Sequence, residues 1–102
     1  MDVQTLAAKL EAGESLFLLD VREPNENDLC QIKGSTLIPM GQVPNRLAEI
    51  PKDIPIVIHC HHGGRSQRVA QYLESQGFNQ LSNLVGGIDQ WAVHINPEIT
   101  RY

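Results

Sequence analysis

The residues best equipped for chemistry lie in one short segment near the middle of the chain. Positions 59–66 read His-Cys-His-His-Gly-Gly-Arg-Ser, so the thiol of Cys60 is followed by two glycines, a guanidinium and a hydroxyl. Glycines let successive N–H groups turn toward one centre, and such a nest at the start of a helix stabilises an anion. The segment therefore predicts a loop that holds Cys60 as a thiolate nucleophile.

The thiolate hypothesis requires only a modest shift in pKa. An ordinary thiol with a pKa of about 8.5 is roughly 3% ionised at neutral pH, and a pKa of about 6.5 would raise this to roughly 75%. That shift corresponds to about 2.7 kcal/mol, which several charge-assisted hydrogen bonds supply. We expect them from the helix N-terminus, the loop amides and Arg65. The alternative is that Cys60 ends a strand as a small buried hydrophobe, but the Gly-Gly-Arg-Ser context favours the nucleophile.

The elements that must position this loop alternate between strands and helices. Apolar runs predict strands at 16–20, 36–38, 56–59 and 81–85. Capping residues and helical spacing predict helices after Asp2, from Pro24, through 69–73 and after 86–87, with one more apolar stripe at Val43, Leu47 and Ile50. This alternation predicts an α/β fold with an open, mostly parallel sheet, in which ligands bind at the carboxyl ends of the strands. Cys60 directly follows the strand at 56–59, and so would lie at such an end.

Composition favours a single small domain. The 102 residues are 41% hydrophobic and 20% charged, with a net charge of −4 that gives no general attraction to nucleic acid or acidic membranes. No apolar stretch approaches the roughly 18 residues of a membrane span, and the N-terminus lacks the pattern of a signal peptide. We therefore expect a cytoplasmic location, a monomer, and two free thiols at Cys30 and Cys60.

Segment 60–66 resembles the Cys-x-x-Gly-x-Arg-Ser active-site loop of rhodanese-like sulfurtransferase domains. Segment 18–26 is similar to the leading Asp-Val-Arg segment of that family, 32–35 to its Ile-x-Gly-Ala/Ser turn, and 86–91 to its closing Gly-Gly-x-x-x-Trp. The resemblance covers nearly the whole chain. It implies one rhodanese-like domain over 1–102, with an open, mostly parallel central sheet flanked by helices on both faces.

The resemblance also implies an activity. Cys60 would take a sulfane sulfur from thiosulfate or another small anionic donor, hold it as a persulfide, and pass it to a thiol, cyanide or protein acceptor, with no metal or organic cofactor. The substrate-binding loop would comprise His61, His62, Gly63, Gly64, Arg65 and Ser66. Arg65 would bind the anionic donor, the alternative being a salt bridge in the first turn of its helix. Asp20 and Arg22 are assigned to the scaffold of a neighbouring loop.

The sequence departs from the family pattern at two places. Cys30-Gln31-Ile32 replaces the common Gly-His-Ile, which makes Cys30 a candidate resolving thiol; the alternative is a residue that fills a small space at a helix end. His61 and His62 replace more usual basic and small residues, so the loop would carry less fixed charge. Metal binding is not expected here, because adjacent side chains point apart and the spaced ligand pairs of zinc sites are absent.

Two functions from other classes remain open. One is a rhodanese-like module that only binds a partner, although such modules often lack the cysteine. The other is a cysteine-dependent phosphatase or arsenate reductase, whose loop places five residues between the cysteine and the arginine. Only four residues separate Cys60 from Arg65, and this tighter ring suits a sulfur atom better than a phosphate group.

Overall fold

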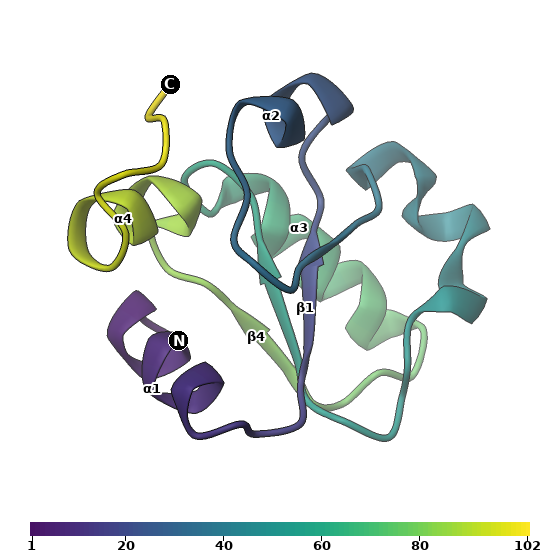
Figure 1. Ribbon diagram of the computed structural model, residues 1–102. Helices are drawn as coiled ribbons and strands as arrows, with labels where there is room; N and C mark the ends of the chain where they lie inside the picture. The colour runs from purple at the N-terminus through teal and green to yellow at the C-terminus, as the bar shows by residue number, and fades with distance from the viewer.

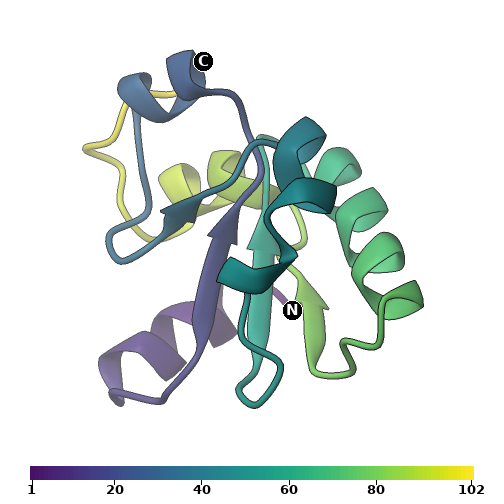
Figure 2. The same cartoon turned by 90° about the vertical axis from the view of Figure 1, so that its right-hand side faces the viewer.

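Strand β3 (Ile56–His59) forms the centre of the fold, and every one of its residues is buried. The computed structural model describes residues 1–102 and contains one parallel sheet of four strands in the order β2-β1-β3-β4. The other strands are β1 (Phe17–Asp20), β2 (Thr36–Leu37) and β4 (Leu81–Asn83). Their carboxyl ends share one edge of the sheet, the upper edge in Figure 2.

Helices cover both faces of this sheet (Figures 1 and 2). Helices α1 (Val3–Glu11) and α4 (Gly87–His94) pack on one face. The other face carries α3 (Gly64–Ser75) and the 3-10 helices η1 (Met40–Asn45) and η2 (Leu47–Glu49). Successive residues of β3 alternate between the two cores, with Val57 in one and Ile58 in the other. The short helix α2 (Pro24–Leu29) lies beyond the carboxyl edge, where it can reach a site at the strand ends.

The predicted fold class and order of elements are confirmed. Some details differ. The element predicted from the stripe at 43–50 is a pair of 3-10 helices, because Pro44 lies inside it and donates no backbone N–H. Strand β4 ends at Asn83 rather than at residue 85, since the N–H of Val85 pairs with the carbonyl of Met1. Strand β2 contains only Thr36 and Leu37. None of the helices is long and apolar enough to cross a membrane.

A fully buried ion pair joins the sheet to α2. Arg22 donates from Nε and Nη2 to the carboxylate of Asp20 at 2.9 and 2.7 Å, and both side chains have no exposed surface. Arg22 also donates to the backbone carbonyls of Glu26 and Cys30 at 3.2 and 2.8 Å, the first residue within α2 and the second at its end. The scaffold role predicted for Asp20 and Arg22 is thus what the structure shows.

Breaking this pair from one side should strongly destabilise the fold. Arg22→Met leaves the Asp20 carboxylate buried without its cation, and we expect a loss of about 3 to 5 kcal/mol in the free energy of unfolding. Denaturant titration measures it. The double variant Asp20→Asn/Arg22→Met removes both charges and should lose clearly less; a larger loss in the double variant would contradict the assigned role of the pair.

Candidate active site

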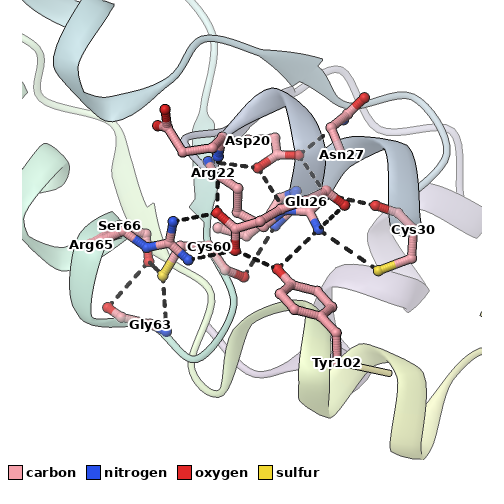
Figure 3. A network of polar contacts seen from close by, with 12 residues as sticks. Asp20, Arg22, Glu26, Asn27, Cys30, Cys60, Gly63, Arg65, Ser66 and Tyr102 are labelled. Carbon is pink, nitrogen blue, oxygen red and sulfur yellow. Dashed lines mark hydrogen bonds and ion pairs between the residues drawn. The ribbon is translucent and has the colours of Figure 1, made fainter. Parts of the chain in front are cut away.

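Cys60 is the first residue after β3, at the carboxyl edge of the sheet. Its side chain is only 1% exposed, so the sulfur lies at the base of the loop that leads into α3. Gly63 has a φ of +119°, a left-handed conformation that turns its N–H back toward Cys60, and this N–H donates to Sγ at 3.1 Å. Gly64 then begins α3. The loop therefore directs backbone dipoles at the sulfur from the start of a helix, as Figure 3 shows.

The hydroxyl of Ser66 is the second donor near the sulfur. Ser66 is fully buried, and its Oγ lies 3.4 Å from Cys60 Sγ, with the carbonyl of Gly63 and the side-chain oxygen of Asn83 also in reach. A hydroxyl has one proton to donate, and a thiolate is the strongest acceptor of these three because it alone is charged. Asn83, at the end of β4, also donates from Nδ2 to Gly63 at 3.2 Å and so supports the loop.

These contacts determine the protonation of Cys60. Burial raises the pKa of the thiol, but hydrogen bonds from the Ser66 side chain and from the backbone N–H groups of Ser66, Gly63 and Arg65 outweigh it. The net result is a pKa below the usual value for a thiol. The sulfur is therefore buried and nonetheless stabilised as an anion.

The N-terminus of α4 holds the loop from the other side. Its amides at Ile88 and Asp89 donate to the carbonyls of Cys60 and His61 at 3.0 and 3.1 Å. This approach needs glycine at position 87, where φ is +58° and an added Cβ would lie 2.5 Å from both carbonyl oxygens. The closing Gly-Gly segment thus fixes the backbone of the cysteine loop.

The guanidinium of Arg65 pairs with α2 across the site. Its Nη1 and Nη2 donate to the two carboxylate oxygens of Glu26 at 2.6 and 2.8 Å, over a separation of 39 residues in sequence. Arg65 does form a salt bridge, but not within the first turn of its own helix. Hydrogen bonding from Arg65 lowers the pKa of Glu26 to about 2, and the hydroxyl of Tyr102 also donates to this carboxylate, at 2.8 Å (Figure 3).

The loop histidines differ in their surroundings. The ring of His61 stacks on Tyr102 with centroids 3.8 Å apart, and burial, followed by the charge of His62, lowers its pKa. His62 is exposed. Burial lowers the pKa of His59 to about 4, so that this side chain is neutral at pH 7. His61 and His62 thus lie side by side in the loop, one packed against Tyr102 and the other open to solvent.

Cys30 is not brought next to Cys60. Both thiols are free, but Cys30 belongs to the core on the α1 and α4 face, whereas Cys60 belongs to the core on the α3 face. In Figure 3 the side chains of Arg22, Glu26 and Tyr102 lie between them. Cys30 ends α2, and its sulfur lies 3.7 Å from Nη1 of Arg22. A resolving role for Cys30 would require the loop or α2 to move.

Three residues near the site were missed by the sequence analysis, namely Glu26, Asn83 and Tyr102. The sequence does carry a local signal for Glu26, because Glu23 and Glu26 form a capping box at the start of α2. That signal concerns the helix alone and does not indicate a contact with Arg65. The contacts of Asn83 and Tyr102 with this site arise only from the tertiary arrangement.

Fold and site together define a class of protein: a parallel α/β domain with a cysteine at the end of its central strand, hydrogen-bonded by the loop that follows. The model of the rhodanese-like domain family matches residues 2–94. The chain therefore belongs to the rhodanese-like family, and the resemblance seen in the sequence is confirmed.

Individual relatives agree with this assignment. A sulfurtransferase of Allochromatium vinosum is 39% identical over 97 residues, which cover 95% of this chain and 91% of the relative. The thiosulfate sulfurtransferase GlpE of Tolumonas auensis is 31% identical, covering 95% of this chain and 90% of that protein. The crystal structure of a rhodanese-related protein from Thermoplasma volcanium superimposes with a TM-score of 0.85 at 27% identity, covering 95% of this chain and 93% of that one. These relatives support sulfur transfer as the general activity and an enzyme of the rhodanese kind.

Filling the space at Gly87 should disturb the cysteine loop. Gly87→Ala combines an unfavourable φ with a collision against two loop carbonyls, and we expect it to lower the free energy of unfolding by more than the roughly 1 to 3 kcal/mol of backbone strain alone. Gly13→Ala is the matched control, because Gly13 has a φ of +71° but open space around it. Denaturant titration of both variants compares them. Equal losses would show that the loop does not depend on this close approach.

Proposed function

We propose that this domain is a sulfurtransferase that carries a sulfane sulfur as a persulfide on Cys60. The observation that supports this most directly is the pair of donors on Cys60 Sγ, the N–H of Gly63 at 3.1 Å and the hydroxyl of Ser66 at 3.4 Å. Such preorganised donors stabilise a charged sulfur before and after loading. The substrate-binding segment is the loop His61–Ser66, and no cofactor is required.

The reaction proceeds as two displacements at sulfur. With thiosulfate as donor, the Cys60 thiolate attacks the outer sulfur; a sulfur–sulfur bond forms to Sγ, the bond between the outer and the sulfonyl sulfur breaks, and sulfite leaves with the electron pair. A nucleophilic acceptor, such as a thiol, cyanide or a protein thiolate, then attacks the outer sulfur of the persulfide and restores the Cys60 thiolate. This is covalent catalysis, which divides one transfer into two steps.

The size of the site favours sulfur over phosphate. Cys60 is almost fully buried and only four residues separate it from Arg65, so the loop receives a single terminal atom more readily than a tetrahedral group. Moreover, the charge of Arg65 is already paired with the carboxylate of Glu26, at 2.6 and 2.8 Å, which weakens its attraction for a phosphate dianion. Phosphoryl transfer is thus less well supported than it was from the sequence alone.

The burial of Cys60 is the one observation that favours a second function, that of a partner-binding module without turnover. A thiol with 1% exposure accepts an outer sulfur only if a donor reaches the base of the loop. The lowered pKa of Cys60 argues for catalysis, because a purely structural thiol gains nothing from stabilisation of its anion.

Sulfur loading distinguishes these two functions. After incubation with thiosulfate we expect intact-protein mass spectrometry to show one added sulfur atom, which is absent in Cys60→Ser and retained in Cys30→Ser, because Cys30 lies in the other core. Addition of cyanide should remove the adduct as thiocyanate. If no adduct forms with thiosulfate or with persulfide donors, the binding module is the better description; loss of the adduct in Cys30→Ser would instead assign it a part in the reaction.

A further inference from the structure

Arg65 is the one arginine of the loop, and its charge is already balanced within the protein. Its Nη1 and Nη2 donate to the two carboxylate oxygens of Glu26, at 2.6 and 2.8 Å. An anionic sulfur donor would therefore meet an ion pair rather than a free positive charge.

Glu26 is held firmly in this position. In addition to Arg65, its carboxylate accepts from the hydroxyl of Tyr102 at 2.8 Å and from the backbone N–H of Glu23 at 3.0 Å. Its lowered pKa keeps it ionised throughout the neutral range. The carboxylate of Glu26 could therefore move away from Arg65 only by also breaking its hydrogen bonds to Tyr102 and Glu23.

The neighbouring cations are compensated in the same way. Arg22 is paired with Asp20, and Arg101 is paired with Asp89 at the start of α4. Arg68, one turn further along α3, lines a hollow against η1 instead. Once Arg65 and Glu26 cancel, none of the three paired arginines offsets the negative charge of a Cys60 thiolate.

We propose that Glu26 is a specificity-determining residue, which makes the Cys60 loop select sulfur donors of at most one negative charge over doubly charged thiosulfate. The proposal rests on the sulfur loading proposed above and identifies its donor class as singly charged thiosulfonates and persulfides. Repulsion between charges scales with the charge of the incoming donor, so a fixed carboxylate at the site penalises a dianion twice as strongly as a monoanion in free energy.

Two donors with the same chemistry separate charge from reactivity. Inorganic thiosulfate is a dianion, and methanethiosulfonate is a monoanion. In both cases Cys60 attacks the outer sulfur and breaks its bond to the sulfonyl sulfur; sulfite leaves from the first and methanesulfinate from the second, each with the electron pair. The second-order rate constant of persulfide formation, followed by mass spectrometry, is the quantity to compare.

Glu26→Gln tests the proposal because glutamine keeps a carbonyl for Arg65 and remains suited to a capping box. We expect the variant to load from methanethiosulfonate about threefold faster and from thiosulfate about tenfold faster, the second factor being about the square of the first. Equal factors for the two donors, or unchanged rates, would overturn the proposal. Failure of the wild type to load from either donor would instead overturn the proposed function, and this inference with it.

Glu49→Gln is the matched control. Glu49 also forms a bidentate pair, with Arg46 at 2.7 and 2.8 Å, but on η2 and on an exposed surface. The Glu49→Gln variant changes the net charge of the protein by the same amount as Glu26→Gln. It should alter both loading rates by less than about twofold, since exposed charges are largely screened with distance. Should Glu26→Gln fold poorly, the wild type provides a second test: added salt should accelerate loading from thiosulfate more than from methanethiosulfonate. The same salt response for both donors would count against the proposal.

Discussion

The site depends on two sets of backbone hydrogen bonds that meet at Cys60. The sulfur of Cys60 accepts from the N–H of Gly63, while the backbone carbonyl of Cys60 accepts from the N–H of Ile88 in α4. The first contact stabilises negative charge on sulfur, and the second fixes the loop that provides it. Both require glycine where the backbone is left-handed or closely approached, at Gly63 and Gly87. The buried strand β3 then holds this arrangement at the carboxyl edge of the sheet.

A second constraint places a charged residue of α2 at the carboxyl edge of the sheet. The buried pair of Asp20 and Arg22 anchors both α2 and the carbonyl of Cys30, so that Glu26 faces Arg65. The scaffold therefore determines the charge around the sulfur as well as the position of the loop. The Gly-rich turn alone would be enough to position the thiol. The carboxylate of Glu26, paired with Arg65, adds the preference among anionic sulfur donors that we propose.

Much of this arrangement could be predicted from local sequence. The apolar runs identified the strands because a parallel sheet buries both of its faces, and the Gly-Gly-Arg-Ser context indicated the loop because its backbone geometry is a local property. The stripe at 43–50 was not resolved, since helical spacing alone does not reveal how Pro44 restricts the backbone. The partners of Arg65 and Ser66 could not be found in this way, because Glu26 and Asn83 are distant in sequence and meet the loop only after folding.

Direct titration of the Cys60 thiol tests the central claim, that the loop stabilises sulfur as an anion. The ultraviolet absorbance of the thiolate, recorded against pH in the Cys30→Ser variant, gives the pKa of Cys60 in the folded protein and again in denaturant. Burial alone would raise the folded value, whereas the hydrogen bonds from Gly63, Arg65 and Ser66 lower it. The account predicts a pKa in the folded protein clearly below the value in denaturant, with thiolate present at neutral pH. A folded value equal to or above the unfolded one would contradict it.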